Sequence, residues 1–319
     1  MRPITLSVPF FLLTAPAMAA VPQVVTDIPA VGSLVAQVMG DLGAPEVLLD
    51  QGANAHNYQL RPSQARALQS ADLVFWIGPE MTPWLDRALQ GVAGGTAIEL
   101  LEAAGTHKRA FDAPHDHEAE DEHADHADEH GAEEHGEEEA HAHSHEGLDP
   151  HAWLDPGNAQ VWLTAIGDQL ATADPENAAT YAANAEAARA RIAQMDSEIS
   201  AQLQPVHDKP FVVAHAAYGY FAEHYALHVA GAVALGDAAA PGAAHLADLR
   251  ADLQADGVVC AFPEAQHDPK QMALLIEGTN VRLGAALDPS GSSLAYGPGL
   301  YEALMRDLGT AISTCLSAE

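Results

Sequence analysis

Between residues 23 and about 105, short apolar runs alternate with longer amphipathic ones. Runs rich in Val, Ile and Leu that suit strands occupy residues 24–28, 46–49 and 73–77. Amphipathic stretches that suit helices lie between them, at residues 32–39 and 62–70. Strands that alternate with helices predict a parallel sheet covered by helices on both faces.

The same alternation returns after residue 210. The expected strands are residues 211–214, 228–233, 258–262 and 281–287, and the expected helices are residues 218–225, 245–255 and 269–278. Two such units predict an α/β fold of two lobes, each with a mostly parallel sheet flanked by helices.

A long helix is predicted between the two units. Asp174 is placed as its N-cap and Pro175 at its first helical position. One apolar stripe steps by three and four residues: Tyr181, Ala185, Ala188, Ile192, Met195, Ile199 and Leu203. A helix over residues 175–203 would be about 43 Å long, at 1.5 Å per residue. We interpret it as a rigid backbone helix joining the lobes; an ordinary surface helix of one lobe is the alternative.

The N-terminus has the pattern of a secretory signal. Arg2 precedes an apolar run at residues 4–13, and the small residues at 17–19 suit a signal-peptidase site. We expect a cleaved signal peptide over residues 1–20 and an exported protein; a transmembrane anchor is the alternative. The remaining chain then divides into an N-terminal lobe (21–170), the linking helix (171–205) and a C-terminal lobe (206–319).

One segment fits neither lobe. Residues 112–146, the His-rich tract, hold fifteen of the acidic residues and no Lys or Arg, so we expect a disordered loop. The formal net charge of −32 argues against nucleic acid as a partner. A solvated acidic spacer is one interpretation, and a set of weak auxiliary zinc sites is the other. The tract's histidines are His115, His117, His123, His126, His130, His135, His141, His143 and His145.

The two cysteines, Cys260 and Cys315, are expected to form a disulfide, because an exported protein enters an oxidising compartment. A zinc–thiolate site is the weaker alternative, since the cysteines lie far apart without a CxxC pairing. Closing a loop of this length stabilises the fold by about 4 kcal/mol.

Three histidines and one aspartate stand at or near expected strand ends or in a rigid turn. His56 follows the second strand, His215 and Asp288 terminate later strands, and His151 lies between two prolines. Ligands of open parallel sheets bind beyond the carboxyl ends of the strands, so these residues should face one crevice. Imidazoles with a carboxylate suit Zn²⁺. Five further histidines are interpreted as surface or packing residues: His207, His224, His228, His245 and His267.

Four motifs resemble the zinc-uptake solute-binding proteins of ABC transporters. They are residues 52–58, 149–156, 214–221 and 278–289, and the similarity spans nearly the whole chain after the signal sequence. The resemblance implies two α/β lobes on a rigid helix, zinc held by the three motif histidines, an acidic His-rich loop beside the site and a C-terminal disulfide.

The resemblance also bears on which metal is bound. Manganese-type relatives carry a carboxylate where this chain has His215, and a third imidazole favours Zn²⁺. Some zinc-binding relatives carry Glu where this chain has Ala55. The fourth ligand is therefore left open between Asp288, a water molecule and a histidine of the tract.

The expected function is transport and not catalysis. A monomeric periplasmic protein would capture Zn²⁺ and deliver it to an inner-membrane ABC permease, with a periplasmic zinc chaperone as a further partner. Two alternative functions remain. One is a zinc hydrolase, because zinc held by three His with an open fourth position also activates water. The other is a periplasmic zinc buffer or chaperone that docks to no permease.

Overall fold

Each half of the chain builds a four-stranded parallel sheet. The computed structural model describes residues 21–92, 94–111, 147–234 and 242–318. The strand order is β2-β1-β3-β4 in the N-terminal lobe and β6-β5-β7-β8 in the C-terminal lobe. The strands are β1 (Val24–Thr26), β2 (Glu46–Val47), β3 (Leu73–Trp76), β4 (Thr96–Glu99), β5 (Phe211–His215), β6 (Val229–Ala234), β7 (Cys260–Phe262) and β8 (Arg282–Leu283).

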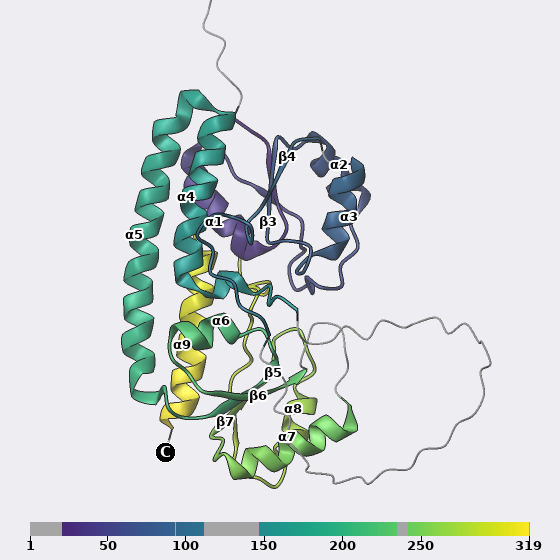
Figure 1. Ribbon diagram of the computed structural model, residues 1–319, viewed down its shortest axis with the longest axis vertical. Coiled ribbons are helices and arrows are strands. Elements are labelled where there is room, and N and C mark those ends of the chain that lie inside the picture. Colours follow the sequence, from purple (N-terminus) through teal and green to yellow (C-terminus); the bar gives the residue numbers. More distant parts are fainter. Residues whose placement is uncertain (1–20, 93, 112–146, 235–241, 319) are drawn as a thin grey trace, which may run out of the picture.

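Helices surround both sheets, and α4 and α5 stand side by side along the N-terminal lobe (Figure 1). The α-helices are α1 (Pro29–Met39), α2 (Pro62–Ser70), α3 (Pro83–Val92), α4 (Pro156–Ala173), α5 (Ala178–Leu203), α6 (Gly219–His224), α7 (Ala243–Ala255), α8 (Lys270–Leu275) and α9 (Leu300–Ser317). The predicted α/β architecture of two lobes with a long linking helix is thus confirmed.

Local sequence explains where several helices begin. Pro29, Pro62 and Pro156 each occupy the first turn of a helix, where a missing N–H costs nothing and the fixed φ suits the helix. The Asp155 side chain caps α4 by accepting a hydrogen bond from the Gly157 N–H at 2.7 Å. This cap fixes the turn that follows His151.

The long helix spans both lobes. The seven residues of its predicted stripe are all buried, as expected. α5 packs against α1 and α4 of the N-terminal lobe and against α9 of the C-terminal lobe, so the interpretation as a surface helix of one lobe is wrong. Its start differs from the prediction. A 3₁₀ turn (Pro175–Asn177) precedes it, and Asp174 is the N-cap of that turn. The Asp174 carbonyl accepts the Asn177 N–H at 3.2 Å, and its carboxylate accepts hydrogen bonds from the Asn177 and Tyr181 side chains.

The lobes share one continuous hydrophobic core. It runs from β1 and α1 through α4 and α5 to β5, β7 and α9. Hydrogen bonds between the lobes reinforce it: Trp153 Nε1 donates to the Pro289 carbonyl at 2.7 Å, and the Tyr301 hydroxyl donates to the Trp153 carbonyl at 2.8 Å. Because close-packed cores do not deform continuously, this arrangement opposes a wide hinge motion.

The disulfide between Cys260 and Cys315 is present and ties β7 to α9, with a Cα–Cα distance of 6.3 Å. In the part of the chain that the structure describes, no helix combines the length and the hydropathy needed to cross a bilayer. The predicted signal peptide and the His-rich tract lie outside the described residues.

Candidate metal centre

His56, His151 and His215 come together between the lobes. One ring nitrogen of each lies within 4.8 Å of those of the other two. The ring centroids are 5.1 to 5.8 Å apart. Zinc ligated tetrahedrally at 2.0–2.1 Å needs nitrogens separated by about 3.4 Å, so the cluster is close to the geometry of a shared ion. Among the described residues, no other group of three or more His, Cys, Asp or Glu meets the same distance criterion.

Sheet topology explains why these residues meet. In each sheet the chain moves first to one side of its opening strand and then to the other, which places a switch point between β1 and β3 and another between β5 and β7. Ligand crevices form at the carboxyl ends of strands at such points. His215 is the last residue of β5, and Glu264 lies just past the end of β7.

A buried carboxylate orients His151. Asp149 Oδ1 lies 2.8 Å from His151 Nδ1 and accepts the His151 backbone N–H at 3.0 Å. Asp149 is fully buried and His151 is 1% exposed. A proton on Nδ1 that is donated to the carboxylate leaves the ring lone pair at Nε2, the arrangement that metal-binding histidines use.

His215 has the same kind of partner in the other lobe. Glu264 Oε2 lies 3.2 Å from His215 Nδ1, and both side chains are buried. Two of the three imidazoles are therefore held by carboxylates, which fixes the ring orientation. The negative charges also favour a bound cation.

His56 is positioned by its loop. Asn54 accepts the His56 backbone N–H at 2.8 Å through its side chain, and Trp84 Nε1 donates to the Ala55 carbonyl at 2.7 Å. Gly52, with φ +76°, donates its N–H to the Ser292 carbonyl of the opposite lobe at 2.9 Å. The loop that carries His56 is thus fastened both to its own lobe and to its neighbour.

The space between the three imidazoles is small. The three histidines, Met81 and Glu264 border a cavity of about 20 Å³, measured as the volume open to the centre of a water molecule. Such a volume holds about one water molecule or one ion. The space between the three imidazoles is therefore large enough for a metal ion.

Among the predicted ligands that the structure describes, Asp288 is the one that lies outside the cluster. One of its carboxylate oxygens accepts hydrogen bonds from the Gln266 amide at 2.9 Å and the Gly291 N–H at 3.0 Å, and the other accepts the Ser293 N–H at 2.8 Å. The carboxylate organises the loop after β8, which a strand-end position alone does not reveal.

Sequence reasoning assigned no role to Asp149 or Glu264. Asp149 lies two residues before His151 in the same motif, so its Asp-Pro-His spacing was the available signal. Glu264 follows the predicted strand at 258–262, and the strand-end argument that selected His215 would have selected it too.

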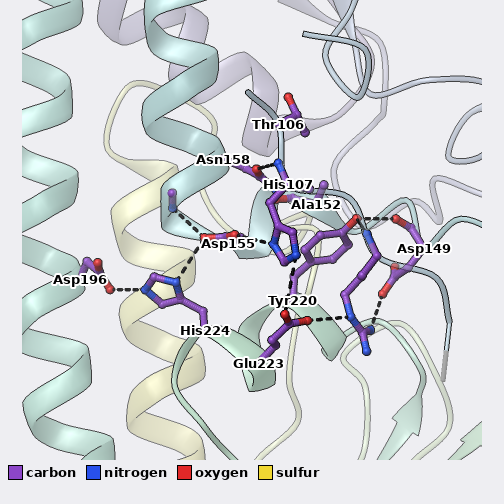
Figure 2. A network of polar contacts seen from close by, with 12 residues as sticks. Thr106, His107, Asp149, Ala152, Asp155, Asn158, Asp196, Tyr220, Glu223 and His224 are labelled. Atoms are coloured by element: carbon purple, nitrogen blue, oxygen red, sulfur yellow. Dashed lines mark hydrogen bonds and ion pairs between the residues drawn. The ribbon is translucent and has the colours of Figure 1, made fainter. Parts of the chain in front are cut away.

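A polar network lies beside the centre (Figure 2). Asp155 contacts His107 Nδ1 at 3.2 Å and His224 Nδ1 at 3.3 Å, and Asp196 of α5 contacts His224 Nε2 at 2.7 Å. The bonds to Asp155 and Asp196 raise the pKa of His224 to about 9, against the opposing effect of burial. Burial pushes the pKa of Asp155 upward, but hydrogen bonds from His224, Gly157 and His107 outweigh it and lower that pKa.

Fold and site together define a two-lobed metal-binding protein of the solute-binding class. Residues 24–315 match the family described as "ZnuA: Zinc-uptake complex component A periplasmic". The chain is 52% identical over 331 residues to the "High-affinity zinc uptake system protein ZnuA" of Paracoccus denitrificans, covering 100% of this chain and 99% of that protein. It is 36% identical to the protein of the same name from Brucella suis, covering 92% and 91%.

The chain therefore belongs to the ZnuA family of periplasmic zinc-uptake components. A crystal structure described as ZnuA superposes with a TM-score of 0.72 at 22% identity, covering 92% of this chain and 99% of that one, and supports the fold. The resemblance deduced from the four motifs is confirmed. Membership places the protein among transport components and not among enzymes.

Proposed function

We propose that this protein captures one Zn²⁺ between its lobes with His56, His151 and His215 and delivers it to the membrane permease of an ABC-type zinc importer. The observation that carries the proposal is the convergence of three imidazoles on one small cavity, two of them backed by buried carboxylates. Three nitrogen ligands of this kind suit Zn²⁺ better than Mn²⁺.

The fourth position of the zinc goes to a water molecule or to a histidine of the tract. Asp288 is the other candidate, but releasing its carboxylate would break the hydrogen bonds that shape the loop after β8. Substituting Asp288→Asn should therefore lower the stability of the apo-protein and leave the coordination number of bound zinc unchanged. X-ray absorption of the zinc-loaded variant measures that coordination number.

The His-rich tract adds weak sites that collect zinc for the central one. Its nine imidazoles among fifteen carboxylates provide many ligands of the right chemistry. Deleting residues 112–146 should leave one tight site and remove the weak ones in a calorimetric titration. Loss of the tight site would contradict this division of roles. Ligation needs neutral imidazole, so acidification towards pH 5 should empty the tract first.

A hydrolase needs a general base next to its metal. Besides the histidines themselves, the described residues place no acid or base other than Glu264 against the cavity between the histidines, and Glu264 is held by His215. A growth experiment distinguishes a zinc buffer that docks to no permease from an uptake component. The full chain should restore growth of a deletion strain in zinc-depleted medium, and the triple variant His56→Ala/His151→Ala/His215→Ala should not. Equal growth of the two strains would contradict the proposal.

The mature protein starts near residue 21, after cleavage of a signal peptide, and works as a monomer. It is organised as a lobe at 21–170, a linking helix at 171–205 and a lobe at 206–319. A zinc chaperone is a further partner in the periplasm. N-terminal sequencing of protein taken from the periplasm tests the cleavage site, and ultracentrifugation tests the monomer.

A further inference from the structure

Arg109 lies at the point where the chain enters the His-rich tract, and its guanidinium is held between the lobes. Nη1 is 3.0 Å from Asp149 Oδ2, and Nε is 3.3 Å from Glu223 Oε2. The Arg109 side chain is 14% exposed. A guanidinium suits such a place because its planar fork contacts two carboxylates at once.

The Asp149 carboxylate is shared between Arg109 and a zinc ligand. Its Oδ2 faces Arg109, while its Oδ1 faces Nδ1 of His151 at 2.8 Å. A fully buried carboxylate is costly without a cation nearby, and Arg109 supplies that cation. The position of the imidazole therefore depends on a residue that does not touch the metal.

The C-terminal lobe is built to receive this side chain. The Tyr220 hydroxyl accepts the Arg109 backbone N–H at 3.0 Å and donates to the Asp149 carbonyl at 3.1 Å. A Cβ on Gly219 would lie 1.5 Å from Arg109 Nη1, so a larger residue there would expel the guanidinium. Figure 2 shows Tyr220, Glu223 and Asp149 gathered at this place. Tyr220 and Glu223 belong to α6, which begins four residues after His215.

Backbone pairing joins the residues that flank the tract on its two sides. Ala110 and Leu148 form an antiparallel bridge, the Asp149 N–H donates to the Arg109 carbonyl at 2.9 Å, and the Phe111 N–H donates to the Gly147 carbonyl at 3.1 Å. Arg109 and Asp149 are thus fixed opposite each other by main chain as well as by charge.

We propose that Arg109 is a positioning residue of the zinc site: it clamps Asp149 against His151 and ties that carboxylate to α6, the helix that follows the ligand His215. The inference rests on the proposed function, because it assigns zinc to these histidines. Arg109 influences zinc affinity through Asp149 and does not contact the zinc itself. Groups that orient metal ligands in this way contribute 10- to 100-fold to affinity.

The test measures zinc affinity of the full chain by competition with a chromophoric chelator. The variants are Arg109→Met, Arg109→Lys, Asp149→Asn and the two double variants Arg109→Met/Asp149→Asn and Arg109→Lys/Asp149→Asn. Arg189→Met is the matched control, because it removes the same charge from an exposed ion pair with Glu186 on α5. Co²⁺ absorption spectra report the ligand geometry, and thermal melts of the apo-proteins report folding.

Arg109→Met should weaken zinc binding 10- to 100-fold and alter the Co²⁺ spectrum, while Arg189→Met changes neither. Arg109→Lys should recover part of the affinity, because an ammonium serves one carboxylate but not both. In the Asp149→Asn background, Arg109→Met should change affinity less than twofold. An equal loss in both backgrounds, or no loss in the first, would overturn the inference. If Arg109→Met does not fold, the same test is made with Arg109→Lys: its loss of zinc affinity in the wild-type background is compared with its loss in the Asp149→Asn background.

Failure of the wild-type chain to bind zinc tightly would instead contradict the proposed function. Tight binding by the wild type together with unchanged binding by Arg109→Met and Arg109→Lys would contradict only the role of Arg109.

Discussion

Glu264 offers a direct measure of how much a buried carboxylate contributes to zinc capture. It lies 3.2 Å from His215 Nδ1, and its side chain is 6% exposed. Glu264→Ala should abolish both the hydrogen bond and its charge. We expect zinc affinity to fall 10- to 100-fold, or about 1.4 to 2.7 kcal/mol.

Glu264→Gln separates the two contributions. The amide oxygen still accepts from Nδ1 and keeps the tautomer, but the charge is lost. Charge-assisted hydrogen bonds are about twice as strong as neutral ones, so Gln should retain about half of the binding energy and lose about 3- to 10-fold in affinity.

The assay is chelator competition at pH 7.5 on apo-proteins whose folding has been checked by circular dichroism. Asp149→Asn is the matched variant on His151 and should show a loss similar to that of Glu264→Gln. Unchanged affinity in both Glu264 variants would refute the argument that this carboxylate supports the ligand. Equal losses for Gln and Ala would refute the role assigned to hydrogen bonding.

Three further predictions concern stability and motion. His224→Gln should destabilise the protein by about 2 kcal/mol at pH 6. The folded-state pKa of His224 is about 9, so its ion pairs contribute stability that is complete below the unfolded pKa of 6.5 and is lost as pH rises through 9. Melts at pH 6 and pH 9.5 should show that the stability difference between wild type and variant shrinks, and a difference that grows with pH would contradict the ion pairs. Cys260→Ser/Cys315→Ser should lower the unfolding free energy by about 4 kcal/mol in denaturant titrations, and an unchanged midpoint would contradict a stabilising role. Zinc binding should leave the radius of gyration nearly unchanged in small-angle scattering, because the lobes share one core; a large compaction would contradict that rigidity.

Much of the fold could be predicted because its signals are local. The stripe from Tyr181 to Leu203 repeats every three to four residues, and each of its members is buried. The predicted helix at residues 62–70 coincides with α2, whose first residue is a proline. The prediction omitted α3, β4, α4 and α9. The strands β2 and β8 are shorter than predicted, because an apolar run shows burial but not how far a strand pairs with its neighbour.

The candidate metal site was predictable in part from position along a strand. His215 follows from the strand-end rule because it is the last residue of β5, and His151 follows from its proline-bounded motif. His56 lies nine residues beyond the last residue of β2, so only the general direction of its loop followed from that rule. The same rule placed Asp288 in the site, but it does not show that loop N–H groups already occupy that carboxylate. The role of Arg109 could not be predicted from the sequence, because its partners lie 40 and 114 residues away along the chain and only the packing of the lobes brings them together.

X-ray absorption at the zinc edge, combined with anomalous diffraction from crystals of the protein loaded with one equivalent of Zn²⁺, tests the central claim most directly. We predict one ion in the crevice between β5 and the His56 loop, with three imidazole nitrogens of His56, His151 and His215 at about 2.0 to 2.1 Å. A first equivalent of zinc bound elsewhere, or held by fewer than these three imidazoles, would contradict that claim.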